Sequence, residues 1–217
     1  MSRNLFAALT FSIILILSGC GSSGSSSSSP APSFSTQILS SAANDGDISV
    51  LNTIPLVTQG NLASVFAGID AASGTEYRAF LDFPLTGSGG VPGSAIIDSA
   101  TLDIFIDSLA IQPAANSVPI RIDLVTFPPN PLLASDFSQT VLATKRSAIF
   151  RSDVNHHVVI DVTGLMAVAQ AQVPPLPDFQ VRISEDLSAI PDGTFDGLVE
   201  IHEATVGRAP LLGVIYH

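Results

Sequence analysis

The thiol of Cys20 is the most distinctive candidate for chemistry, because the chain has no other cysteine. A lone thiol cannot form an intramolecular disulfide, so a redox pair within the chain is excluded. Cys20 follows an apolar run, Leu5 to Leu17, that is too short for a ~30 Å hydrocarbon core, which needs about 20 helical residues. Arg3 precedes the run and serines follow Cys20, which is typical of a cleaved secretory signal and not of a transmembrane or buried helix.

Leu17-Ser18-Gly19-Cys20 resembles the lipobox of bacterial lipoproteins. In those proteins the cysteine receives a diacylglyceryl group, the signal is cut before it, and the new amino terminus is usually acylated as well. The resemblance implies that residues 1–19 are a signal peptide and that Cys20 is a lipidated membrane attachment point, since about two acyl chains give stable anchoring. Gly21, and not Asp, follows Cys20, which by enterobacterial sorting rules implies the outer membrane. Whether the protein faces the periplasm or the exterior stays open.

Residues 20–43 are predicted to form a flexible linker. Residues 22–29 contain seven serines and one glycine, and Pro30 and Pro32 follow. Such a composition buries too little apolar surface to offset the entropy of ordering. The segment from Cys20 to Phe34 has a root-mean-square reach of about 20 Å. The remaining residues, 44–217, are numerous enough for one domain with a sizeable core.

The charge balance restricts the partners. The net charge is −11, and it becomes −12 without residues 1–19, because that segment contains Arg3 and no acid. Nucleic acid and anionic lipid headgroups require basic surfaces, so neither is an expected partner. Uronic-acid polysaccharides would be repelled as well.

Alternating apolar and polar residues predict a series of β-strands. The segments with this pattern are 76–83, 99–107, 118–125, 156–163, 178–184 and 197–203. Residues 210–217 are apolar on both faces, as in a central strand, and turns rich in Gly and Pro separate the segments. Residues 163–172 have good helix formers and are followed by Pro174. The pattern therefore predicts an all-β sandwich or closed barrel with one short helix.

Four of these segments, in this order and spacing, resemble the landmarks of the DNRLRE domain, a disaggregatase-related repeat that overlaps carbohydrate-binding module family 96. The matching segments are Arg78 to Leu85, Ile97 to Ile104, Asp161 to Met166 and Arg208 to Tyr216. The resemblance spans roughly residues 44–217. It implies an antiparallel jelly-roll β-sandwich on a secreted or surface-attached protein, and it implies a carbohydrate ligand.

Catalytic and metal-binding motifs are incomplete. The chain has no G-x-S-x-G elbow, and His202-Glu203 lacks the second histidine of H-E-x-x-H. His156 and His157 are adjacent, so in a strand they would point to opposite faces and could not chelate one ion together. The segments 44–47 and 191–197 could offer oxygens to a structural calcium ion, but neither completes a calcium loop, and plain turns are the favoured interpretation. We expect no enzymatic activity, no cofactor and no metal.

A ligand site is predicted on the outward faces of three strands. If these strands share a sheet, aromatic rings would lie beside charges that can orient a glycan or peptide. The predicted residues are Arg78, Phe80, Asp82, Asp103, Phe105, Asp107, Arg121 and Asp123. The alternative is that a loop or the other sheet covers both phenylalanines, and that Arg and Asp form ordinary cross-strand pairs.

Two functions are consistent with the sequence. The first is a lipid-anchored, non-catalytic module of the cell envelope that binds a polysaccharide or a partner protein. The second is a structural or assembly subunit of an envelope complex that binds no small ligand. The sequence does not name the ligand or the oligomeric state.

Replacing Cys20 with Ala should prevent lipid attachment and leave unprocessed precursor or unlipidated secreted protein. The replacement removes the only thiol that can accept the diacylglyceryl group. Metabolic labelling with a fatty acid measures this directly. Equal labelling of the Cys20→Ala variant and the wild type would show that the lipoprotein interpretation is wrong.

Overall fold

The structure, a computed structural model, describes residues 32–112, 115–190, 197–205 and 207–217. The predicted signal peptide, Cys20 and the serine-rich stretch lie outside these residues. No helix within the described ranges is long and apolar enough to cross a membrane.

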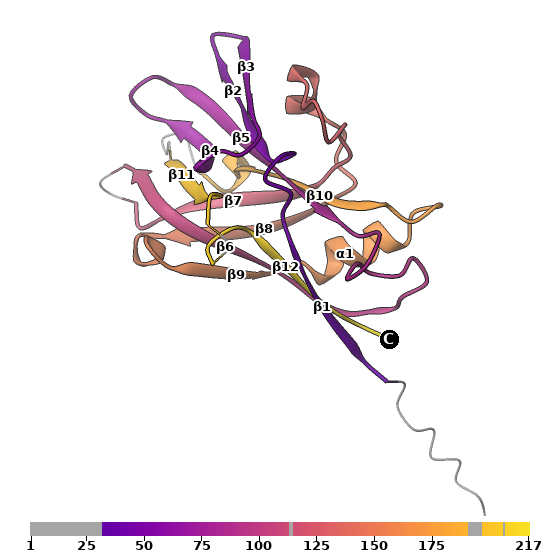
Figure 1. Ribbon diagram of the computed structural model, residues 1–217. Helices are drawn as coiled ribbons and strands as arrows, with labels where there is room; N and C mark the ends of the chain where they lie inside the picture. Colours follow the sequence, from indigo (N-terminus) through magenta and orange to yellow (C-terminus); the bar gives the residue numbers. More distant parts are fainter. Residues whose placement is uncertain (1–31, 113–114, 191–196, 206) are drawn as a thin grey trace, which may run out of the picture. The chain divides into compact units, whose positions relative to one another are not determined.

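The described residues form twelve strands, one α-helix and three short 3-10 helices (Figure 1). The first six strands are β1 (Phe34–Leu39), β2 (Gly46–Leu51), β3 (Ile54–Gln59), β4 (Ser64–Asp70), β5 (Thr75–Pro84) and β6 (Ile97–Ile111). The others are β7 (Ser117–Leu124), β8 (Ala143–Phe150), β9 (His157–Asp161), β10 (Asp178–Glu185), β11 (Gly197–His202) and β12 (Leu211–Tyr216). The helices are α1 (Thr163–Gln170), η1 (Ala134–Ser138), η2 (Arg151–Asp153) and η3 (Leu187–Ala189).

The strands pair antiparallel and curl into the predicted all-β, jelly-roll-like sandwich. Their order is β1-β12-β6-β11-β4-β5-β10-β7-β8, with β9 paired to β6 and the β2–β3 hairpin paired through β2 to β5. The long strand β6 belongs to both layers. Residues 97–105 pair with β12 and β9, whereas residues 106–111 pair with β11. The sheet therefore turns back on itself along one strand.

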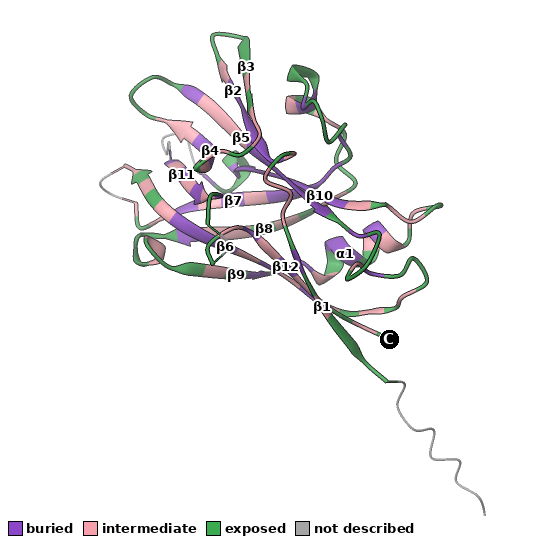
Figure 2. Cartoon of the chain, in the orientation of Figure 1, coloured by how far each residue is buried: buried purple, intermediate pink, exposed green. Residues whose placement is uncertain are grey.

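The core lies between the layers and follows the predicted strand faces. Leu102 and Ile104 on β6 are fully buried, as are Ala79, Leu81 and Phe83 on β5. The central strands β5 and β10 are buried on both faces over most of their length (Figure 2). A polar residue on their outer faces is therefore a buried residue, which the alternation alone did not reveal.

Helix α1 begins where the sequence predicted it and ends at Gln170, two residues early. The Asp161 carboxylate starts it by accepting hydrogen bonds from the Thr163 amide at 3.0 Å and the Thr163 hydroxyl at 2.6 Å. Leu165 and Met166 lie on its buried side, in the main core, and the helix packs against β6 and β8.

The predicted linker, residues 20–43, extends too far into the domain. Residues 34–39 form the edge strand β1, which pairs with β12 over its whole length. Ile38 lies between the exposed residues Gln37 and Leu39 and reaches the core, where it is 7% exposed. The folded unit therefore starts before residue 44, and the stretch between Cys20 and Phe34 is what remains for a linker.

Truncating Leu102 or Ile104 to Ala should lower the free energy of unfolding by about 2–5 kcal/mol, because each leaves a cavity in a fully buried site. Chemical denaturation of the purified variants measures this loss. The matched control is Asp103→Asn, between them on the other face, which should change stability by only about 0.5 kcal/mol. Similar small changes in all three variants would contradict the register of β6.

Candidate functional site

The structure separates the eight predicted site residues into two groups. Strand β10 lies between β5 and β7, and strands β11 and β4 lie between β6 and β5. The residues of β5 and β7 therefore belong to one surface and those of β6 to another. The prediction of a single patch across three strands is wrong, because the strand order depends on pairings between distant segments.

The group on β5 and β7 is covered by the segment that follows β7. Phe80 has no exposed surface, and its ring meets the edge of Phe127 with centroids 5.4 Å apart. Val125 and Leu132 complete this second apolar cluster together with Ile48 of β2. The alternative considered above, a phenylalanine covered by a loop, is the correct one for Phe80.

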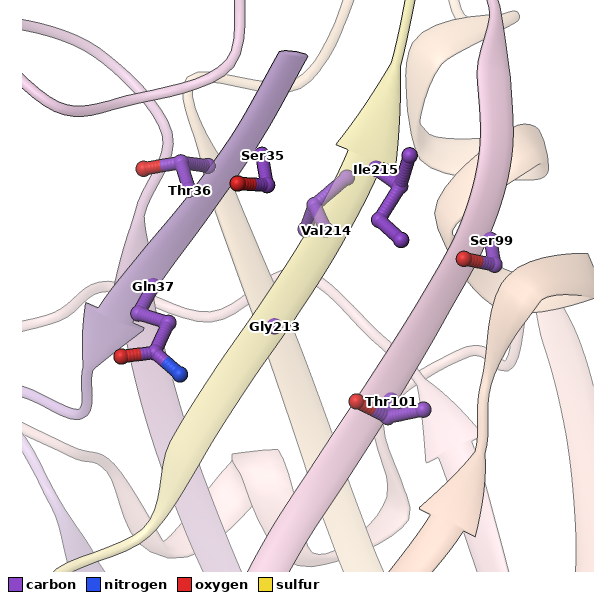
Figure 3. Close-up of a pocket in the computed structure, with 8 residues that line it drawn as sticks. All are labelled: Ser35, Thr36, Gln37, Ser99, Thr101, Gly213, Val214 and Ile215. Carbon is purple, nitrogen blue, oxygen red and sulfur yellow. The ribbon is translucent and has the colours of Figure 1, made fainter. Parts of the chain in front are cut away.

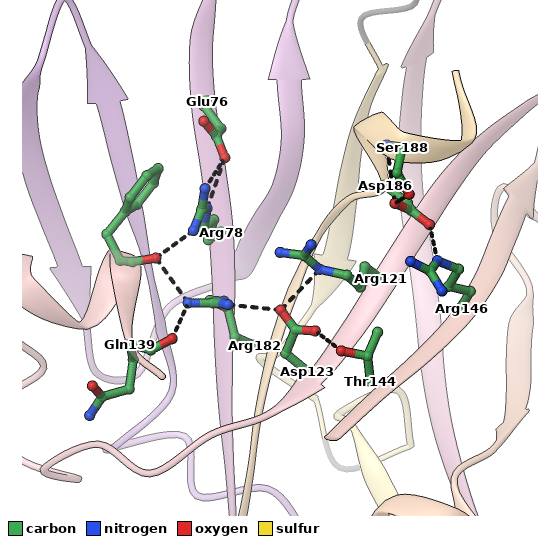
Figure 4. A network of polar contacts seen from close by, with 11 residues as sticks. Glu76, Arg78, Arg121, Asp123, Gln139, Thr144, Arg146, Arg182, Asp186 and Ser188 are labelled. Atoms are coloured by element: carbon green, nitrogen blue, oxygen red, sulfur yellow. Dashed lines mark hydrogen bonds and ion pairs between the residues drawn. The ribbon is translucent and has the colours of Figure 1, made fainter. Parts of the chain in front are cut away.

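The predicted charges of this group form a buried ion network (Figure 4). Asp123 has no exposed surface, and its carboxylate accepts a hydrogen bond from Arg182 Nη2 at 2.8 Å and from the Thr144 hydroxyl at 2.7 Å. Arg121 lies 3.0 Å from the same carboxylate. Arg78 pairs with Glu76. The network neutralises buried charge inside the fold.

The covering segment is fixed to this network. Arg78 lies over the Phe137 ring, 3.8 Å from its centroid, and Arg182 donates to the carbonyl oxygens of Phe137 and Gln139. Asp82 accepts hydrogen bonds from Asn44 and Gln180 and is 2% exposed. Arg78, Phe80, Asp82, Arg121 and Asp123 therefore hold a loop on a sheet and do not form an open ligand surface.

The group on β6 pairs with two histidines from neighbouring strands. Asp103 contacts His157 Nδ1 of β9 at 2.9 Å, and Asp107 contacts His202 Nδ1 of β11 at 2.7 Å. Phe105 lies between the two pairs. The Arg208 guanidinium lies 4.4 Å from its ring centroid, and the ring is 5% exposed. Phe105 is therefore covered too, by side chains and not by a loop.

Sequence reasoning did not find the partners of Asp103 and Asp107. The alternation in residues 156–163 and 197–203 placed histidines on strands, but only the pairing of β6 with β9 and β11 brings them to these acids. His156 does not join His157, since its ring contacts the Val154 carbonyl oxygen. Among the described residues, no group of three or more His, Cys, Asp or Glu side chains is arranged to hold a metal ion.

A shallow groove lies on the sheet formed by β1, β12 and β6 (Figure 3). Its volume is about 560 Å³, and Gly213 leaves its middle without a side chain. The hydroxyls of Ser35, Ser99 and Thr101 and the amide of Gln37 line it. Its side chains lack an aromatic ring and a charge, so it offers a ligand only neutral hydrogen bonds.

A second hollow, of about 380 Å³, lies beside the β2–β3 hairpin, and we call it the hairpin cleft. The lining residues are Asp47, Ser49, Leu56, Thr58, Leu62, Ala63, Ser64, Phe66, Tyr77 and Glu200. The rings of Phe66 and Tyr77 are tilted by 56° with centroids 5.8 Å apart. The cleft thus combines two half-buried aromatic rings with three hydroxyls, from Ser49, Thr58 and Ser64, which is the better recognition surface of the two.

The two carboxyl groups in the cleft are already engaged. The Asp47 carboxylate is 4% exposed and accepts the Phe66 amide at 3.3 Å, and burial raises the pKa of Asp47 to about 6. The Glu200 carboxylate accepts the Ser108 hydroxyl at 2.6 Å. The Ser64 hydroxyl also donates to the Asp107 carboxylate, at 3.2 Å, and Ser49 is 8% exposed, so the exposed hydroxyl at the opening is that of Thr58.

Comparisons with known proteins do not place the chain in a family. No family model matches it, and no curated protein matches it. One solved structure with some likeness is an arabinose-bound α-L-arabinofuranosidase, with 11% sequence identity and a TM-score of 0.23. That match covers 83% of this chain and 26% of the arabinofuranosidase chain, so this chain spans about a quarter of its length.

Replacing Asp123 with Ala should lower the free energy of unfolding by about 3–5 kcal/mol, because it leaves Arg182, 3% exposed, as an unpaired buried charge. The matched control is Asp98→Ala. It removes the Asp98–His217 pair, in which the side chains are 37% and 33% exposed, and should cost about 1 kcal/mol or less. Urea denaturation of both variants makes the comparison. A loss below about 1 kcal/mol in Asp123→Ala would contradict the structural role of the network.

Proposed function

We propose that the chain is a lipid-anchored, non-catalytic module of the bacterial cell envelope, and that it binds a neutral polysaccharide in the hairpin cleft. The observation that carries the proposal is the Phe66–Tyr77 ring pair beside three hydroxyl side chains in an open hollow. Sugar rings bind by stacking their apolar faces on aromatic rings while hydroxyls exchange hydrogen bonds.

The anchor half of the proposal rests on Leu17-Ser18-Gly19-Cys20 and on the position of β1. The folded unit begins at Phe34, which leaves a short serine-rich linker after Cys20. A protein attached in this way stays at the membrane surface, where polysaccharides of the envelope are within reach. The outer membrane is the proposed location because Gly21 follows the cysteine.

The charge of the protein favours a neutral ligand. The mature chain would carry a net charge of −12, and Asp47 and Glu200 lie in the cleft itself. An acidic polysaccharide would meet repulsion there, whereas a neutral one would not. The strand motifs that resemble the DNRLRE domain also favour a carbohydrate.

A specific observation favours the second function, an assembly subunit. Ile54 and Leu56 on the edge strand β3 are 72% and 66% exposed, and Leu51, which pairs with Ile54, is 42% exposed. Neighbouring exposed apolar side chains on an unpaired strand edge are typical of a protein–protein contact. In that case a partner protein would cover the hairpin, and the ring pair would be part of its footprint.

A bulky charged residue in the cleft wall should abolish polysaccharide binding without loss of stability. Thr58 is exposed, so Thr58→Arg should fill the opening and change the free energy of unfolding by only about 0.5 kcal/mol. Pull-down by neutral insoluble polysaccharides measures binding, and thermal unfolding checks the fold. We expect the bound fraction of the variant to fall at least about tenfold.

The matched control is Gln37→Arg, an equally exposed position in the groove of Figure 3. It should leave binding unchanged. If Gln37→Arg loses binding while Thr58→Arg keeps it, the polysaccharide site lies in that groove and not in the hairpin cleft. If the wild type binds no neutral polysaccharide, but a partner co-purifies from detergent-solubilised membranes and is lost in Leu56→Asp, the assembly function replaces the proposal.

A further inference from the structure

Two acidic side chains meet in the interior near one end of the hairpin cleft. Asp45 lies in the turn between β1 and β2 and is 1% exposed, and Glu203 directly follows β11 and is 3% exposed. The Asp45 carboxylate lies next to that of Glu203 and next to the Ser40 hydroxyl. Two connections of the fold, the one between β1 and β2 and the one after β11, thus bring their oxygen atoms to one point.

Most of these oxygen atoms have no partner outside the group. Asp45 Oδ1 accepts the Asp82 amide at 2.7 Å. Asp45 Oδ2, both carboxylate oxygens of Glu203 and the Ser40 hydroxyl are buried, and among the described residues their side-chain neighbours are one another. Buried polar groups in folded proteins are almost always fully paired, so two buried carboxyl groups that face each other and one hydroxyl leave room for a ligand.

A positively charged ligand would relieve the repulsion between these carboxyl groups. Asp82 is a third nearby carboxyl group, and it adds repulsion to the pair. Within the described part of the chain, no basic side chain acts on either carboxyl group, and burial together with this repulsion raises the pKa of Asp45 to about 7 and that of Glu203 to about 9. Without a cation, the pair must hold a proton at neutral pH, since two adjacent buried carboxylates repel each other strongly.

We propose that Asp45 and Glu203 bind a divalent metal cation, specifically Ca²⁺. Among the described residues, the side-chain atoms that converge here, from Asp45, Glu203 and Ser40, are oxygens, which favours a hard cation over zinc or copper. Ca²⁺ accepts irregular sets of carboxylate, hydroxyl, carbonyl and water oxygens, whereas Mg²⁺ requires near-octahedral geometry and keeps its water. Two carboxylates and Ser40 supply part of the shell, and backbone carbonyls or water supply the rest.

The site would join segments that carry the two walls of the cleft. Asp45 is two residues before Asp47 in the hairpin wall, and the Glu203 amide donates to the Ala63 carbonyl, next to Ser64 in the other wall. The Gly60 amide at the end of the hairpin donates to the Asp45 carbonyl. A cation at this point would fix the hairpin relative to β4 and β11. This role does not depend on what the cleft binds.

Calcium should raise the thermal stability of the full-length protein, purified in detergent and first stripped with a chelator. At pH 8, addition of CaCl₂ to about 5 mM should raise the melting temperature by about 5 °C, as expected for an extracellular site with a Kd of about 10⁻⁴ M. Isothermal titration calorimetry should find one site per chain. Mg²⁺ at the same concentration should give a much smaller rise.

Asp45→Asn and Glu203→Gln should each remove the calcium-dependent rise. At pH 8 and without metal, Glu203→Gln should unfold at or above the temperature of the wild type, because it removes a repelling charge. Asp98→Asn is the matched control, since Asp98 is a partly exposed acid elsewhere on the surface, and it should keep the full rise.

The pH dependence separates a cation from a shared proton. The folded pKa values of the pair lie above the ordinary values near 4, so the metal-free folded state holds extra protons and loses stability as the pH rises from about 5 to 8. Calcium should abolish this loss in the wild type. If the loss persists in calcium, the pair shares a proton and the proposal is overturned. An equal calcium response in Asp98→Asn and Glu203→Gln would show adventitious surface binding and overturn it as well.

Discussion

Hydrogen bonding along β6 is the constraint on which the rest of the fold depends. This strand pairs with β12 and β9 in one layer and with β11 in the other, so it sets where the two layers meet and how far the sheet curls. Its inward row, Leu102, Ile104 and Ile106, fills the core between them. Its outward row brings Asp103 and Asp107 to their histidines. A shift of one residue along β6 would exchange these two rows.

Buried charge is handled in two different ways in this acidic chain. Asp123 is buried together with Arg182, so its charge is neutralised by the protein itself. Asp45 and Glu203 are buried together without a basic side chain acting on them. The first arrangement fixes the loop after β7 on the sheet. The second leaves two adjacent acids that must share a proton or bind a cation.

The sequence was informative where structure is local. Alternation identified the inward rows of β5, β6 and β7, and composition with Pro174 identified α1. It failed where neighbours are distant in the chain. Phe80 looked outward because its alternation is that of a half-buried strand, and only the packing of residues 125–139 buries it.

The β2–β3 turn was hard to recognise too, because Thr53 follows Asn52 in a left-handed conformation where glycine is usual. The hairpin cleft therefore could not be predicted.

The pairing of β1 has a mechanical consequence for a protein held at its amino-terminal end. A pull on the linker enters the folded unit at Phe34 and is directed along β1. Six antiparallel residue pairs, from Phe34–Tyr216 to Leu39–Leu211, join this strand to β12, and their hydrogen bonds run across the strand direction. A load along the strand is therefore shared by all six pairs in shear and does not open them one at a time. In a chain tethered by Cys20 as proposed, the edge strand β1 would act as a clamp between the tether and the core.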